Sequence, residues 1–336
     1  WWSIRGGADS HADYSSAGDT RVINSRFANY SAKGAFGFRR ERWTSTNSVM
    51  ISFSEFGFVF DSLAQDVDDG RSSRSFSGPH HAVMLAVLSS ENTFYGDRVK
   101  WKVNAGWISN KRQEQEGGNK ISLDMLLNTA SVAAQGSMEI APGFNWTNGA
   151  SVLFQTNTNI GSRIIVPDAT TVEGSVFSLA RREVGRFSIE GGIRFDRRNI
   201  NAVRTLSLDQ PFNKGWNAVN GSLGCAWNPL DELNIKANVS SGYRSGNLAE
   251  LGSNGLHEGT RRWEIGDPTL AIEQNLCAEI GFLYEWKEQV ELGGSLYHNA
   301  FADYIHLAPT GTDTLGLAIY RYVQADAILQ GGEATL

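Results

Sequence analysis

A polar stretch between residues 245 and 272 holds the side chains best suited to binding chemistry. His257, Glu258, Arg261, Arg262 and Trp263 all lie within it. An imidazole can ligate a metal ion, and guanidinium groups bind carboxylates and other anions through paired hydrogen bonds. The indole adds an aromatic surface. The stretch is therefore a candidate site for a metal or for an anionic, partly aromatic ligand, and the alternative is a loop of solvated or hydrogen-bonded side chains.

Other reactive residues give weaker indications. His80 and His81 are adjacent, and adjacent residues of a strand point to opposite faces, so both cannot hold one metal and we expect them in a loop. Cys225 and Cys277 have opposite face parity in strands that we do not expect to pair, which predicts no disulfide. The sequence has no nucleophile elbow, Walker loop or metal-spaced Cys/His cluster. We therefore predict that the chain is not an enzyme.

The candidate site connects two stretches of regular alternation. Leu233–Arg244 precedes it and Gln274–Trp286 follows it, and Trp216–Asn228 lies one short turn upstream. In each stretch, apolar residues alternate with small, polar or charged residues. A period of two requires one face of a strand to lie against apolar material and the other against water.

Strand length separates the two architectures that have this pattern. Strands of soluble sandwiches usually run about 5–6 residues, whereas a tilted strand that crosses a bilayer needs about 9–11. The alternating stretches here reach a dozen residues or more, and very short turns alternate with long polar loops. These features predict an all-β fold, a transmembrane antiparallel β-barrel.

Composition agrees with a barrel and excludes other classes. The net charge of −6 argues against a basic surface that would bind nucleic acid. No apolar run approaches the roughly 18 residues of a membrane helix. The aromatic residues suit interfacial girdles, for which we identify Trp101, Trp107, Trp227, Tyr284 and Trp286. Side chains expected on the water-filled interior are Lys100, Lys102, Glu190, Arg194, Asp196 and Lys236.

The alternation predicts about fifteen strands, all part of one barrel domain over residues 1–336. A parity switch within Asn47–Phe60 predicts a β-bulge. Ala302–Gly316 is expected to be a loop, followed by separate strands at Leu317–Asp326 and Ala327–Leu336. Single-chain bacterial barrels normally close with an even number of strands, so the odd count leads us to expect that further chain, or another polypeptide, completes the wall.

Several sequence boxes resemble those of one family. Residues 241–251, SGYRSGNLAEL, resemble the "GFRAPNLAEL" signature of TonB-dependent outer-membrane receptors. SNGLHEGT at 253–260 and EIGDPTL at 264–270 are similar to the continuation of that signature, in the manner of receptors of the Bacteroidota. Ser245-Gly246 replaces the usual Ala-Pro, and Asp267-Pro268-Thr269 replaces Asn-Pro-Asn, which bears on loop conformation and cargo.

This resemblance implies a 22-stranded barrel that encloses an N-terminal plug domain and imports a scarce nutrient across a Gram-negative outer membrane. TonB and the inner-membrane energising complex would be partners, together with outer-membrane lipid, lipopolysaccharide and surface lipoproteins. We find no plug, TonB box or final strands, so the chain resembles a middle segment of such a receptor. The implied cargo is a ferric siderophore, haem or another metal chelate, with no intrinsic cofactor. Some haem receptors of the family place a ligand histidine where His257 falls.

Two other functions remain open from the sequence. A barrel could serve as a structural or docking component of a larger outer-membrane assembly, with its loops holding partner proteins. A secreted β-sandwich adhesin would need shorter strands and a water-soluble chain.

Overall fold

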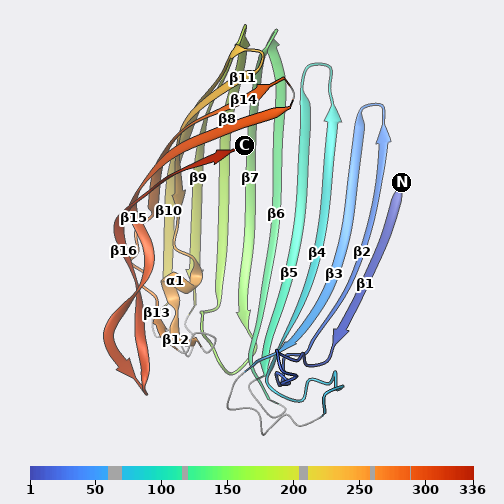
Figure 1. Cartoon of the computed structure of the whole chain (residues 1–336), viewed down its shortest axis with the longest axis vertical. Coiled ribbons are helices and arrows are strands. Elements are labelled where there is room, and N and C mark those ends of the chain that lie inside the picture. The colour runs from blue at the N-terminus through green and yellow to red at the C-terminus, as the bar shows by residue number, and fades with distance from the viewer. Residues whose placement is uncertain (60–69, 116–119, 204–210, 258–261, 288) are drawn as a thin grey trace.

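The computed structural model describes residues 1–59, 70–115, 120–203, 211–257, 262–287 and 289–336. Within them the chain forms one curved sheet of 16 strands and a single short helix (Figure 1). The strands of the first half are β1 (Trp2–His11), β2 (Phe27–Arg40), β3 (Trp43–Gly57), β4 (His80–Tyr95), β5 (Lys100–Gln115), β6 (Ile121–Ala141), β7 (Phe144–Asn159) and β8 (Ala169–Val184). The remaining elements are β9 (Phe187–Ala202), β10 (Phe212–Leu230), β11 (Leu233–Arg244), α1 (Leu248–Gly252), β12 (Asn254–His257), β13 (Arg262–Ile265), β14 (Glu273–Trp286), β15 (Val290–Thr314) and β16 (Leu317–Thr335).

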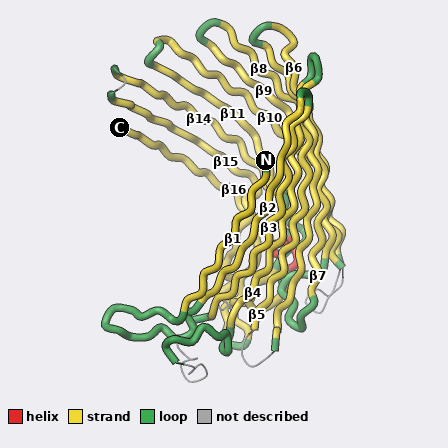
Figure 2. The backbone as a smooth tube through the Cα atoms, turned by 90° about the vertical axis from the view of Figure 1, so that its right-hand side faces the viewer, coloured by secondary structure: helices red, strands yellow, loops and turns green. Residues whose placement is uncertain are grey.

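The long strands follow one another around the sheet in chain order, each antiparallel to the next. The exception is β11, which pairs with β14 because α1, β12 and β13 form an insert between them. Very short turns join the strands at one end of the sheet, and the long connections gather at the other, at the bottom of Figure 1. Figure 2 shows the wall curving between its outermost long strands, β1 and β16. No helix among the described residues is long and apolar enough to cross a membrane.

The two faces of the sheet differ in chemistry, as the alternation predicts. One face, here called the apolar face, exposes large side chains such as Val152 (59%), Ile193 (59%) and Val219 (62%). The registers place all five predicted girdle residues on this face. The opposite polar face carries the six predicted interior residues, including the ion pair between Arg194 and Asp196 at 2.8 Å. The all-β class and the alternation are therefore confirmed.

Three local predictions are wrong. The registers of β3 with β2 and β4 run without a shift, so Asn47–Phe60 contains no bulge in its described part. Instead the apolar side chains change face, with Phe53 on the apolar face and Phe56 on the polar one.

The predicted loop at Ala302–Gly316 is mostly strand, because β15 continues to Thr314. Pro309 and Gly311 lie where the register of β15 with β16 shifts, between Pro309 and Asp313. The expected strands at Leu317–Asp326 and Ala327–Leu336 are one strand, β16. Fourteen long strands and the two short strands of the insert therefore replace the predicted fifteen.

The two cysteines lie as expected. Cys225 pairs with Ile189 on the apolar face, whereas Cys277 pairs with Ser240 on the polar face. Both thiols are free.

An ion cluster orders the connection between β1 and β2. The Asp13 carboxylate lies 2.8 Å from the guanidinium of Arg21 and 2.9 Å from that of Arg26. Burial opposes ionisation of Asp13, but the hydrogen bonds that Arg26 and Arg21 donate outweigh it, so the pKa of Asp13 lies below its ordinary 3.8. The ionised Asp13 carboxylate thus stabilises the folded connection fully at pH values above its ordinary pKa. This stabilisation is lost as the pH falls through the lowered pKa of the folded state.

We therefore expect hydrogen exchange of residues 12–26, corrected for intrinsic rates, to accelerate as the pH falls below about 4. The Asp13→Asn variant should exchange rapidly already at neutral pH and lose this dependence. Unchanged protection of the unmodified connection down to low pH would contradict the role of the carboxylate.

Candidate functional site

The insert between β11 and β14 contains the predicted site and begins with the short helix α1. Asn247 caps the helix: its side-chain oxygen accepts the Glu250 backbone N–H at 2.9 Å, and the Glu250 carboxylate accepts the Asn247 backbone N–H at 2.8 Å. This reciprocal capping box satisfies two backbone donors at the helix start. The sequence analysis missed α1, although the spacing of Asn247 and Glu250 is the signal that could have revealed it.

Arg244 anchors the helix to the wall. Its guanidinium donates to both oxygens of Glu250 at 2.8 Å and to Glu273 at 2.8 Å. Glu273, the first residue of β14, also accepts the backbone N–H of Ile305 at 2.9 Å. Both carboxylates are buried. The arginine of the signature box therefore joins the end of β11, α1, β14 and β15 in one ion cluster.

Apolar packing holds the insert on the polar face, near the end of the sheet that carries the long connections (Figure 1). Leu251 of α1 is fully buried, and Leu270 is 4% exposed. Both belong to a small core with residues of β8, β9, β10 and β15, namely Ala169, Ile200, Ala202, Trp216 and Ile305. The insert thus spans the inner side of the wall from β8 to β15.

The strands β12 and β13 complete the insert as a hairpin. β13 pairs in parallel with β16, with Trp263 opposite Ile319. The Arg262 guanidinium lies 2.7 Å from buried Glu264 and 5.2 Å from the centre of the Tyr320 ring. The insert is therefore bonded to the wall on two sides, through β13 and through Arg244.

Gly266 makes the close approach between the two parts of the insert. A Cβ at this position would lie 2.6 Å from the Gly252 nitrogen and 2.7 Å from the Leu251 carbonyl carbon, which are backbone atoms that cannot rotate away. We expect Gly266→Ala to destabilise the insert by about 1–3 kcal/mol, measured as increased protease cleavage within residues 245–272.

The control is Gly174→Ala on β8, where a Cβ meets nothing within 4 Å. If both variants showed the same resistance to protease as the unmodified protein, the close packing of Gly266 would be refuted.

Three of the five predicted site residues, His257, Arg262 and Trp263, lie on the strands of this hairpin. His257 ends β12 opposite Arg262, whereas Glu258 and Arg261 lie outside the described residues. Trp263 donates its indole N–H to Asn254 at 3.2 Å. Arg262 and Trp263 thus have partners within the protein, and their part in ligand binding stays a prediction.

His80 and His81 were expected in a loop, but they are the first residues of β4 and both are buried. As adjacent residues of β4 they point to opposite faces, and they contact different carboxylates: His80 Nε2 lies 3.3 Å from Glu55, and His81 Nε2 lies 2.6 Å from Glu114. No group of three or more His, Cys, Asp or Glu residues within the described ranges could hold a metal ion.

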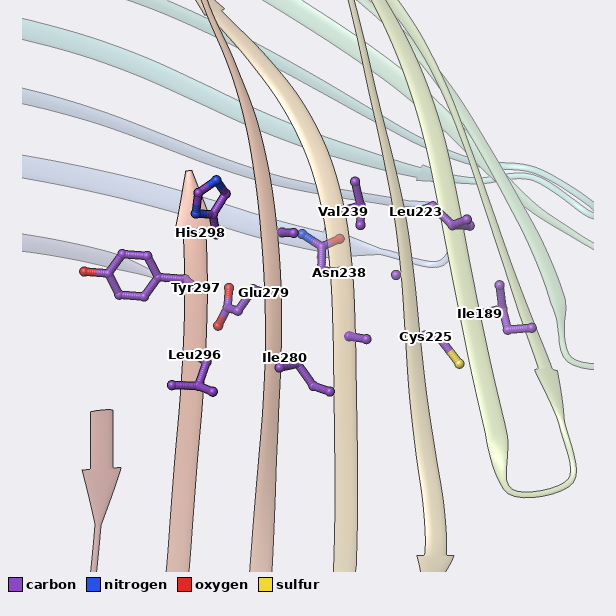
Figure 3. Close-up of a pocket in the computed structure, with 13 residues that line it drawn as sticks. Ile189, Leu223, Cys225, Asn238, Val239, Glu279, Ile280, Leu296, Tyr297 and His298 are labelled. Carbon is purple, nitrogen blue, oxygen red and sulfur yellow. The ribbon is translucent and has the colours of Figure 1, made fainter. Parts of the chain in front are cut away.

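An apolar groove of about 610 Å³ lies away from the insert, on β9, β10, β11, β14 and β15. Its lining includes Ile189, Leu223, Val239, Ile280 and Leu296 of the apolar face (Figure 3). This face offers few polar groups to orient a charged ligand, so we place the candidate site at the insert.

Comparison with known proteins identifies the fold. The copper transporter OprC superposes with a TM-score of 0.78 at 13% identity, covering 99% of this chain and 53% of that structure. A double mutant of the Serratia marcescens hemophore receptor HasR, in complex with its hemophore HasA and heme, gives 0.75 at 13% identity, with 99% and 56% covered. The siderophore receptor PirA from Pseudomonas aeruginosa gives 0.73 at 12%, with 99% and 56% covered. The chain thus spans little more than half the length of these structures.

No curated protein matches the sequence. The family model described as TonB dependent receptor-like, beta-barrel, matches residues 3–336. That family comprises receptors and transporters of Gram-negative outer membranes, in agreement with the expectation that the chain is not an enzyme. The chain therefore belongs to the TonB dependent receptor-like β-barrel family.

Proposed function

We propose that this chain forms part of the wall of an outer-membrane transporter that imports a scarce nutrient. The cargo we favour is a ferric siderophore or a related metal chelate, moved with energy delivered through TonB and the inner-membrane complex. Residues 1–336 would form part of one barrel domain, a middle segment of a receptor of the Bacteroidota type. The observation that carries the proposal is the ion-anchored insert on the polar face, within a chain that matches the family along almost its whole length.

The two faces support a place in the outer membrane. A wall with one apolar and one polar face, built from strands of up to 25 residues, suits a barrel with lipid outside and water inside. Lipid and lipopolysaccharide would then contact the apolar face. Surface lipoproteins are further proposed partners at the end that carries the long connections.

We also propose that the hairpin of the insert contacts the cargo. His257 would supply an imidazole for haem iron or another metal, and Glu258, Arg261, Arg262 and Trp263 would surround an anionic chelate. The ion pair of Arg262 with Glu264 leaves its guanidinium partly exposed, at 32% of the side chain. That exposed part is available to a ligand.

The test is to purify the native receptor in detergent and to measure its metal content and absorption spectrum. Bound iron or haem would support import, and loss of a haem spectrum in His257→Ala would support ligation. A metal-free barrel that stays bound to stoichiometric partner proteins would instead favour the docking component.

A further inference from the structure

The apolar groove on β9, β10, β11, β14 and β15 lies between two rows of side chains on the apolar face (Figure 3). The registers align one row, here called the near row, from Ile189 on β9 to Leu296 on β15. The far row lies two residues further from the short turns and runs from Leu223 on β10 to His298 on β15. The groove is therefore a channel between two ridges, and an imidazole stands at its β15 end.

This β15 end of the groove is polar, although the face around it is not. His298 Nδ1 lies 3.3 Å from the side-chain oxygen of Gln330, its partner on β16. Both side chains are exposed, and Leu296 and Ala300 are the neighbours of His298 along β15 on this face. Among the residues that the structure describes, the imidazole Nε2 and the Gln330 amide nitrogen have no further partner. Unpaired polar groups are costly in hydrocarbon, so these two atoms require a polar partner from outside the wall.

The polar end lies near one boundary of the apolar band. His298 is eight residues from Val290, which pairs with the girdle residue Trp286. With a rise of about 3.3 Å per residue and a tilt of about 35–45°, this separation is about 20 Å along the bilayer normal, in a band about 25 Å tall. At the other end of the groove, Ile189 is only two residues from Phe187, where β9 begins. The groove thus descends by about six residues, or about 15 Å, which is the depth of one leaflet in a hydrocarbon core about 30 Å thick.

The width of the groove selects its occupant. The two rows are about 7 Å apart along the strands. A helix with its side chains is about 10–12 Å wide, so it would rest on the ridges and leave the groove unfilled. A single hydrocarbon chain fits between the rows, against Leu223 and Leu296, which are 63% and 65% exposed. The carbonyl group that links such a chain to its headgroup accepts hydrogen bonds, and the Gln330 amide can donate one.

We propose that the groove binds one acyl chain of a membrane lipid, from the leaflet on the side of the long connections. The linkage carbonyl of that chain accepts a hydrogen bond from Gln330, which His298 holds in place, and the tail follows the groove toward Ile189. This inference rests on the proposed function, which places the apolar face in the outer membrane, and it adds a defined lipid site to that face.

The experiment uses the native receptor in phosphatidylcholine vesicles that contain a phosphatidylcholine with a photoreactive diazirine in one acyl chain. After illumination, the labelled peptides are identified by mass spectrometry. Labelling at the groove is compared with labelling on β7 and β8, where Val152 and Val176 are 59% and 53% exposed on the same face. These two strands lie outside the groove and serve as the reference for bulk lipid.

Two double variants test the site. Ala237→Leu with Ala278→Leu fills the groove from two exposed positions on β11 and β14. His298→Leu with Gln330→Leu removes the polar pair and leaves the ridges in place. Ala150→Leu is the matched control, because Ala150 is exposed on the same face of β7, outside the groove. Leucine at these exposed positions faces lipid, so the fold should persist in all three proteins.

We expect the groove of the unmodified receptor to be labelled about tenfold more than the reference strands, which is the scale of hydrogen bonding to the polar pair. Both double variants should reduce this labelling to the reference level, and Ala150→Leu should leave it unchanged. Equal labelling of groove and reference in the unmodified receptor would overturn this inference alone. So would labelling that persists without the polar pair, or a groove shielded from the label, because a protein partner would then cover it. A receptor that is not labelled anywhere on the apolar face would overturn the proposed function as well.

Discussion

The Arg244→Ala substitution is expected to destabilise the insert between β11 and β14 by about 3 kcal/mol. Removal of the guanidinium leaves Glu250 and Glu273 as buried carboxylates, 8% and 6% exposed, without their cation. Breaking a buried ion pair from one side costs about 3–5 kcal/mol, and we take the lower end because the Arg244 side chain is itself 40% exposed. Glu250 also forms the capping box with Asn247. The substitution should therefore weaken both the attachment of α1 to the wall and the capping of its first turn.

The measurement is hydrogen exchange of residues 245–257 and 262–272 in the native receptor, with protease cleavage as a second readout. Arg186→Ala is the control, because its ion pair with Asp231 is exposed on both sides and should contribute at most about 1 kcal/mol. Protection of α1 that survives in Arg244→Ala would show that apolar packing around Leu251, and not the ion cluster, holds the insert.

A second large effect is expected from charge placed on the apolar face. Val103 lies between Trp101 and Trp107 on that face of β5, and Ile193 is 59% exposed on β9. Arginine at either position should cost about 2–4 kcal/mol in a bilayer, because the guanidinium would enter the hydrocarbon region. The free energy of folding into lipid vesicles, from guanidinium titration, measures the cost.

The neighbouring position provides the matched control. Asn104 follows Val103 in β5 and lies on the polar face, so Asn104→Arg should cost far less than Val103→Arg. Equal costs at the two positions would contradict the assignment of the faces to lipid and water.

The wall could be predicted from sequence because alternation is a local property. Each residue of Leu233–Arg244 has a face fixed by its parity, and the observed registers with β10 and β14 follow that parity. The same argument failed at Phe56, where apolar residues continue on the polar face. Parity alone cannot distinguish a bulge from an apolar patch on the inner wall, because both move the apolar residues to the other parity.

The insert could not be predicted, because its structure depends on distant partners. Arg244 meets Glu273 across 29 residues of sequence, and Glu273 accepts the N–H of Ile305 from another strand. β13 pairs with β16, whose sequence lies more than fifty residues downstream. Only the capping box of α1 is a local signal, and it was missed because the stretch was interpreted as loop throughout.

The parallel pairing of β13 with β16 also limits what can happen at the edge of the sheet. The backbone of β16 around Tyr320 faces β15 on one side and β13 on the other, so it has no open edge at that level. An unpaired strand edge invites uncontrolled addition of other chains. The insert therefore limits where a further strand can pair with β16: the edge that β13 leaves uncovered is mainly the part after Arg321, which runs toward the end of the sheet with the short turns (Figure 1).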